Sequence, residues 1–300
     1  KPFKFPPPDG FQPLNTANVR PETVISRPDQ YVGVTTYTGN GSTQTNSELN
    51  HKPDLVWLKA RTAGGGSFTN HVMVDSVRGS NSYGYKNLYP NLTDTEYDPP
   101  NVSSSSVTSL NSNGFDIGGN ANTNHNTATY VAWSWKAGGS SGTFNIDGVS
   151  YATAAAAGLT AGDVTPTGAS VGTKQGFSII RWTAPTWNGS PQQVPHGLTQ
   201  SPSFMITKVT DDIASWYCYH KDFHATSPED YYIVMNDWAS RGTLANAWGT
   251  NPPDNTTFGD RQIGWSDDKD VISYIWHDVP GLQKFGTYVG NEDTGGNGPF

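Results

Sequence analysis

This sequence has little cysteine, little charge and no long apolar run, and each shortage excludes a class of protein. Its single cysteine, Cys218, has no partner for an intramolecular disulfide or a thiolate metal site, so we expect a buried thiol in a strand. Only 15% of the 300 residues are charged, and the net charge of −8 argues against nucleic-acid binding, which needs a positive patch for phosphate. No apolar run approaches the roughly 20 residues of a membrane span, so we expect no membrane insertion.

Recognisable catalytic and metal-binding patterns are scarce as well. The sequence contains no Gly-x-Ser-x-Gly elbow, no Walker loop and no dinucleotide fingerprint. His220 and His224 have the i, i+4 spacing that brings ligands together on a helix, but the residues before them read as a strand. The acidic stretch 267–270 lacks the full pattern of a calcium-binding loop. We therefore predict no catalytic residue, no metal and no cofactor.

Aromatic and turn-forming residues are abundant instead. The chain has 10 Trp, 14 Tyr, 33 Gly and 21 Pro, and aromatic residues make up 12% of it. A disordered chain would be poor in aromatics, and a helical one would avoid Gly, Pro, Asn and Thr. Short aromatic and β-branched runs separated by Gly, Pro and Asn favour an all-β fold of the sandwich or barrel type.

The sequence also repeats itself. Five landmarks recur in the same order, at Tyr37 and Trp182, Pro53 and Pro202, Asn91 and Asn236, Phe115 and Phe258, and Trp135 and Trp276. Their offsets are 145, 149, 145, 143 and 141 residues (182−37, 202−53, 236−91, 258−115 and 276−135). A unit of about a hundred residues has the size of a domain. We therefore predict two tandem β-sandwich-like modules with long loops, followed by a third copy that is only begun.

This organisation gives five segments. They are an extended Pro-rich arm or connector (1–30), a first β module (31–136), a Gly/Ser/Ala linker (137–175), a second β module (176–280) and the truncated start of a third repeat (281–300). Within the linker we expect a short helix over 151–157, because alanine has the highest helix propensity and Gly158 suits a C-cap.

Tryptophans in the predicted loops are the candidate ligand-binding residues. Trp rings can stack on sugar rings while their N–H groups bond water or hydroxyls. Four tryptophans lie in or beside predicted loops, namely Trp187, Trp238, Trp248 and Trp265. The alternative for each is packing between modules or subunits. The remaining tryptophans lie in predicted strands and are expected in the core.

Several of these motifs resemble a known family. Residues 37–41, 53–59 and 130–136 resemble a repeat module of tailed-bacteriophage virion proteins, which often follows a lectin-like domain. Residues 7–18 resemble the connector that comes after that domain, and residues 158–162 resemble versions from phages of cyanobacteria. The resemblance implies a virion surface protein made in the host cytoplasm, in a tail fibre or similar appendage. It brings no catalytic residue with it.

The resemblance and the loop tryptophans together give the expected function. We expect a structural and adhesive virion component whose modules act as spacers and present loops to host surface polysaccharide. Other virion proteins and further copies of the chain are the expected partners, with a trimer as the oligomer. One alternative is a capsid decoration protein or another purely structural virion protein. The other is an enzyme, a polysaccharide depolymerase.

Overall fold

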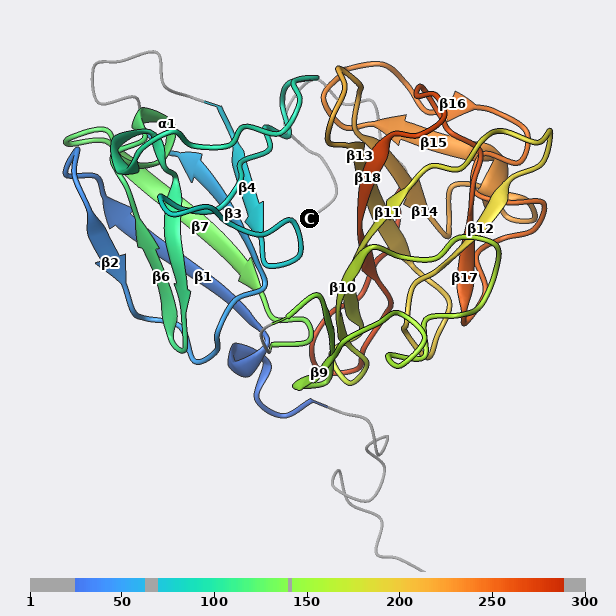
Figure 1. Cartoon of the computed structure of the whole chain (residues 1–300), viewed down its shortest axis with the longest axis horizontal. Coiled ribbons are helices and arrows are strands. Elements are labelled where there is room, and N and C mark those ends of the chain that lie inside the picture. Colours follow the sequence, from blue (N-terminus) through green and yellow to red (C-terminus); the bar gives the residue numbers. More distant parts are fainter. Residues whose placement is uncertain (1–24, 63–69, 140–141, 289–300) are drawn as a thin grey trace, which may run out of the picture.

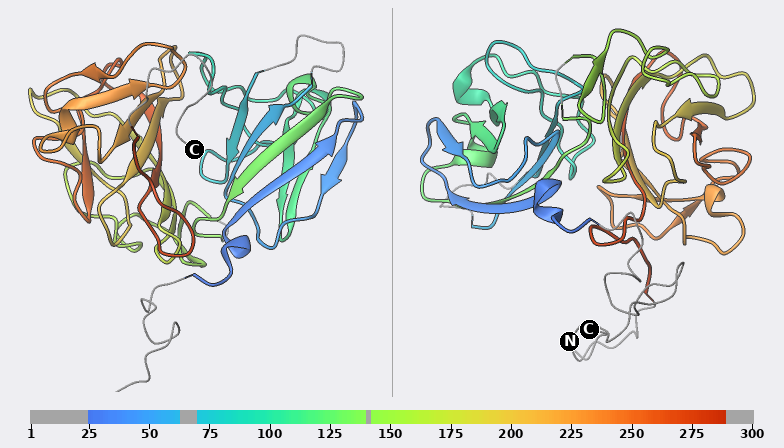
Figure 2. Two further views of the ribbon diagram at one scale, coloured as in Figure 1. Left: turned by 180° about the vertical axis from the view of Figure 1, so that it is seen from behind. Right: turned by 90° about the horizontal axis from the view of Figure 1, so that it is seen from below.

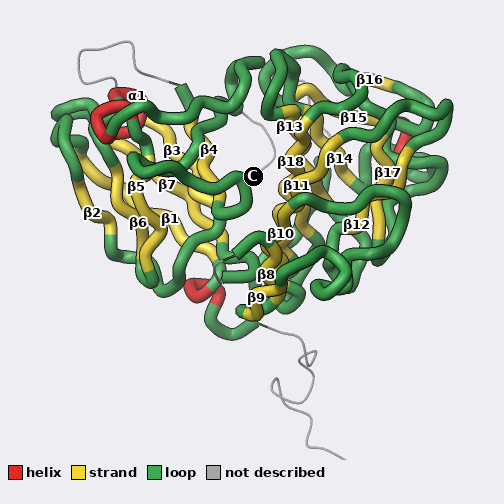
Figure 3. Tube along the Cα trace, in the orientation of Figure 1, coloured by secondary structure: helices red, strands yellow, loops and turns green. Residues whose placement is uncertain are grey.

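The structure, a computed structural model, describes residues 25–62, 70–139 and 142–288, and the regular elements of these residues are nearly all strands (Figure 1). Long loops connect the strands, and helix is confined to a few short pieces (Figure 3). These pieces are η1 (Pro28–Gln30), η2 (Val102–Ser104), α1 (Ala121–Asn124) and η3 (Pro228–Asp230). The all-β fold class predicted from the sequence is confirmed.

The first module is a sandwich of two antiparallel sheets. The larger sheet has the strand order β1-β7-β3-β4, formed by β1 (Val32–Thr38), β7 (Thr129–Trp135), β3 (Leu55–Ala60) and β4 (Val72–Asp75). The smaller has the order β2-β6-β5, formed by β2 (Gln44–Asn46), β6 (Gly114–Ile117) and β5 (Val107–Asn111). Alternate side chains of each sheet point into a shared core that includes Val56, Leu58, Val74, Phe115 and Ile117.

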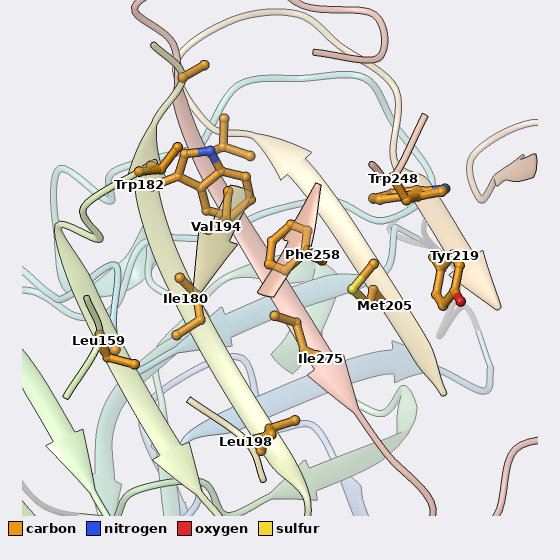
Figure 4. Close-up of a cluster of buried hydrophobic side chains, with 14 of the residues drawn as sticks. Leu159, Ile180, Trp182, Val194, Leu198, Met205, Tyr219, Trp248, Phe258 and Ile275 are labelled. Atoms are coloured by element: carbon orange, nitrogen blue, oxygen red, sulfur yellow. The ribbon is translucent and has the colours of Figure 1, made fainter. Parts of the chain in front are cut away.

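The second module repeats this plan within a larger, nine-stranded sheet. Its centre has the order β11-β18-β13-β14, formed by β11 (Phe177–Thr183), β18 (Asp270–Trp276), β13 (Phe204–Val209) and β14 (Tyr217–His220). One side adds β15 (Tyr231–Val234) and β16 (Gly242–Thr243), and the other adds β10 (Gly168–Gly172), β8 (Phe144–Ile146) and β9 (Val149–Tyr151). A small sheet of β12 (Gln192–Pro195) and β17 (Thr257–Asp260) covers the inner face over an aromatic core (Figure 4).

Strand register shows that the two modules are copies of one fold. In each, the last strand lies between the first and the third, with pairing partners Val32 and Leu55 for Trp135, and Phe177 and Phe204 for Trp276. The offsets between these equivalent residues are 145, 149 and 141 (177−32, 204−55 and 276−135), the same offsets that relate the sequence landmarks. The repeat in the sequence is therefore a repeat of sheet topology and register.

The segment 137–175 differs from the expected linker. It supplies β8, β9 and β10, which extend the second module's sheet beyond β11. The expected helix over 151–157 is wrong: Tyr151 ends β9, and the alanines after it form turns that end at Gly158 with φ +75°. So short a segment cannot repay the cost of helix nucleation. The turns instead bury Ala154 and Leu159 against the core.

The predicted flanking segments lie only partly within the described residues. Residues 1–24 and 289–300 lie outside them, and Pro28–Gln30 form a 3-10 turn rather than extended chain. Of the predicted third repeat, residues 281–288 are described and contribute one isolated bridge, between Val279 and Gln283. The N–H of Ile25 donates to the carbonyl of Pro280 at 3.1 Å, so the chain enters the first module and leaves the second at the same place.

The two modules pack against each other through the outer faces of their large sheets (Figure 2). One apolar cluster takes Leu55, Met73 and Trp135 from the first module and Ile206 and Trp276 from the second, among others. The rings of Trp135 and Trp276, which are equivalent residues of the two copies, meet at 6.0 Å between centroids. The modules therefore share a core.

Buried polar contacts join the modules beside this cluster. The hydroxyl of Tyr274 donates to Asp75 at 2.7 Å, and the same carboxylate is paired with the buried guanidinium of Arg78 at 2.6 Å. Trp216 donates its indole N–H to the carbonyls of Tyr89 and Leu92 in the first module. Because these groups are buried, losing a partner would leave a polar group without water or protein to bond.

Candidate ligand site at the loops of the second module

The structure separates the four loop tryptophans into three environments. Trp248 belongs to the core: it is 2% exposed, its indole N–H donates to the carbonyl of Tyr231 at 2.9 Å, and its ring packs edge-on against Tyr219 (Figure 4). This ring cannot stack on a ligand, so Trp248 is removed from the candidate set. Trp238 is the opposite case, 99% exposed on the loop that follows β15.

Trp187 and Trp265 are brought to one place by two loops that hold each other. The first loop follows β11 and carries Trp187, and the second joins β17 to β18 and carries Trp265. The N–H of Trp187 donates to the carboxylate of Asp267 at 2.8 Å, and the N–H of Asp268 donates to the carbonyl of Ala184 at 2.8 Å. These bonds join residues about eighty positions apart in the sequence, and they fix the two loops relative to each other.

An open pocket of about 580 Å³ lies where these loops meet. Its walls are the side chains of Trp187, Arg261, Gln262, Ser266 and Asp267. The guanidinium of Arg261 lies 6.0 Å from the centroid of the Trp187 ring, within the range of a cation–π contact. The pocket thus offers one aromatic face together with a cation, a carboxylate, an amide and a hydroxyl.

Trp265 supports the pocket without lining it. Its ring is partly buried and packs edge-on against Tyr217 at 5.8 Å, at the margin of the second module's core. Of the four predicted tryptophans, Trp187 is therefore the one whose ring faces this pocket, and Trp265 holds the loop that carries the pocket's polar residues.

A buried carboxylate anchors the start of that loop. Asp260 ends β17 with 4% of its surface exposed, and its Oδ1 accepts the N–H of Gln262 at 2.7 Å. Burial raises the pKa of Asp260 to about 6, and its contacts with Gln262, Trp182 and Trp265 oppose that rise. Gln262 has a positive φ of 56°, a conformation disfavoured for side chains other than glycine, so the bond to Asp260 helps to hold it.

The sequence reasoning missed the pocket's polar residues. Asp267 was weighed only as part of a calcium loop, and it bonds the Trp187 backbone instead. Arg261, Gln262 and Ser266 carry no local signal, because their role depends on a loop that is distant in the sequence.

The histidine pair does not form a site. His220 lies on β14, and His224 lies in the following loop, where its ring stacks on Tyr231 at 5.0 Å. Within residues 25–62, 70–139 and 142–288, no group of three His, Cys, Asp or Glu side chains is placed to hold a metal ion. Over the same ranges, no helix has the length and apolar character needed to cross a membrane.

Comparison with known proteins identifies one family. The family model described as Domain of unknown function (DUF7483) matches residues 27–300. The search of curated proteins and the search of solved structures each returned no match.

Proposed function

This chain belongs to the DUF7483 family over residues 27–300, and we propose that it is a structural virion protein of a tailed phage. In this proposal it forms part of a tail fibre or similar appendage and presents the loops of its second module to glycans of the host surface. The motif resemblance at residues 37–41, 53–59 and 130–136 supports the virion assignment. The pocket beside Trp187 supports adhesion.

The observation that carries the adhesive role is that Trp187 lines an open pocket together with polar side chains. A sugar ring presents an apolar face of C–H groups and an edge of hydroxyls. The ring of Trp187 suits the face, while Arg261, Gln262 and Asp267 suit the hydroxyls. A pocket this open holds a single sugar weakly, so useful affinity requires several copies of the chain.

Oligomerisation supplies those copies. We propose a closed symmetric oligomer, a trimer, attached to other virion proteins. Binding through three linked sites can exceed the affinity of one site by about 10²–10⁴-fold when the geometry allows simultaneous contact. The fully exposed Trp238 would then serve either as a second glycan contact or as a contact between subunits.

The test is binding of purified protein to surface polysaccharide from susceptible hosts. An aromatic stacking contact is worth up to about 1.5 kcal/mol beyond the area that it buries, so Trp187→Ala should weaken binding about tenfold per site. Tyr83→Ala is the matched control, because Tyr83 is an exposed ring of the first module. Binding that is unchanged in Trp187→Ala, or absent for every susceptible host, would reject the adhesive role.

A purely structural virion role, such as capsid decoration, is the second candidate. It is favoured by the use of aromatic residues in the contact between modules, where Trp135, Trp216 and Trp276 are all committed to packing. Locating the chain in a map of the particle separates the two roles. Placement on the capsid surface with no glycan binding would support decoration over adhesion.

A further inference from the structure

A second pocket lies on the outer face of the second module's sheet, the face that also packs against the first module. It encloses about 400 Å³ and shares no residue with the pocket beside Trp187. Its floor is formed by β13, β14 and β15, and its rim includes residues 286–288. The side chains that line it are almost all apolar or aromatic, namely Phe204, Cys218, Phe223, Ile233, Met235 and Tyr288.

One polar side chain, His220, stands in this apolar wall. It is 7% exposed, and its ring lies between the rings of Phe204 and Phe223, at 6.3 and 5.5 Å. Its Nδ1 accepts the backbone N–H of Asp222 at 3.0 Å. Because Nδ1 is an acceptor and burial lowers the pKa of the ring, the neutral imidazole carries its proton on Nε2.

This Nε2–H is a buried donor with no hydrogen-bond partner in the described structure. Native proteins rarely leave buried donors unpaired, and an unpaired group in a pocket wall is explained when a ligand provides the partner. A mostly apolar pocket with a single polar group that fixes orientation is the common form of a small-molecule site.

We propose that this pocket binds a small, neutral, ring-sized molecule that carries one hydrogen-bond acceptor. The ring occupies the space between Phe223, Ile233 and Met235, and its acceptor atom accepts a hydrogen bond from the Nε2–H of His220. The site is independent of glycan adhesion, because the two pockets have no lining residue in common.

Two probe molecules of nearly the same shape test the proposal. Acetophenone has a carbonyl oxygen beside its ring, and ethylbenzene has a methylene group at that position. The readout is the methyl NMR spectrum of methionine-labelled protein, which has only three methionines. Met235 lines the pocket, whereas Met73 and Met205 are fully buried and lie outside it, so they act as internal references.

We expect acetophenone to shift the Met235 methyl signal saturably, leave the two reference signals in place, and bind about tenfold more tightly than ethylbenzene. His220→Asn should abolish the tenfold preference. Asparagine can still accept the N–H of Asp222 but has no donor at the position of Nε2. His224→Asn is the matched control and should keep the preference, since His224 does not line the pocket.

Three results would overturn the proposal. The first is a Met235 signal that does not move with either probe. The second is a movement of all three methyl signals together, which indicates non-specific binding. The third is equal affinity for the two probes in the wild-type protein, a result that needs no variant to fold.

Discussion

The two modules form the same hydrogen bond at equivalent positions but with different acceptor groups. The acceptor is a carboxylate in the first module and a hydroxyl in the second. In the first module the carboxylate of Asp54 accepts the backbone N–H groups of Ala137 and Gly139, at 2.7 and 3.0 Å. In the second module Ser203 takes the place of Asp54, and its hydroxyl accepts the N–H of Asp278, the counterpart of Ala137, at 3.2 Å. Each module thus uses a side chain before its third strand to hold the chain that leaves its last strand.

A graded effect of substitutions at Asp54 follows from this equivalence. Asp54 is buried and also accepts the hydroxyls of Ser76 and Ser170. Asp54→Ala leaves buried donors unpaired and should cost about 3 kcal/mol of unfolding free energy. Asp54→Ser, which installs the residue of the second copy, should cost about half as much. Urea unfolding measures both, and equal losses would mean that the carboxylate acts only by filling space.

Two buried titratable residues should give opposite contributions to the pH dependence of stability. Burial lowers the pKa of His196 to about 4, and the hydrogen bond between its Nε2 and the carbonyl of Asp254 opposes that shift. Its contribution to stability is present above the unfolded pKa of 6.5 and is lost as the pH falls toward 4. Burial raises the pKa of Asp260 from 3.8 to about 6, so its contribution is present at low pH and is lost as the pH rises toward 6.

Asp260→Asn should therefore expose the full effect of His196. Between pH 6.5 and 4 the variant should lose stability more steeply than the wild type, with a difference of up to about 3 kcal/mol. Chemical unfolding at several pH values measures the slopes. Parallel curves for the two proteins would show that Asp260 titrates as it does in the unfolded chain.

At the scale of strands, sequence pattern predicted those elements whose own residues carry the signal. The alternation in 130–135 and the apolar run in 55–58 correspond to β7 and β3, and their repeats correspond to β18 and β13. Strand β10 was missed because its alternation is short and weak: Gly168–Gly172 has only Ala169 and Val171 as apolar side chains. Its five residues are buried only because β11 and β8 pair with it on both sides.

In the candidate site too, residues with a signal in their own sequence segment were predicted, and residues whose role depends on a distant loop were not. Trp187 and Trp265 were singled out by residue type and by loop context, and both lie at the loops of the pocket. The contribution of Arg261 and Asp267 depends on bonds between loops that are distant in the sequence, so no local pattern could reveal it. Trp248 was misplaced because a loop-like sequence around it folds back over the core, with Ala247 and Trp248 both buried.

At the scale of the whole molecule, we expect the two modules to unfold as one cooperative unit. They share an apolar cluster, and backbone bonds join Ala214 to Thr93 and Glu96 to Thr210 across the boundary. Neither large sheet could expose its outer face to water without uncovering this cluster. We therefore expect the stabilities of the two modules to be coupled.

Hydrogen exchange tests this coupling. The amides of β7 and β18 should open with the same free energy in the wild type. Trp216→Ala removes the indole that bonds Tyr89 and Leu92, and it should lower protection in both modules by about 3 kcal/mol. Trp238→Ala, at a fully exposed ring, should leave both unchanged. Lower protection confined to β18 would show that the modules unfold separately.

The contact between Ile25 and Pro280 changes how such a protein would carry force. A polypeptide pulled from both directions would first load this backbone bond and the packing of Phe285 on Phe204, and the sheets beyond them would stay unstretched until these contacts broke. The paired modules would therefore lie to one side of the line of force, so that they increase the width of an appendage but hardly its length.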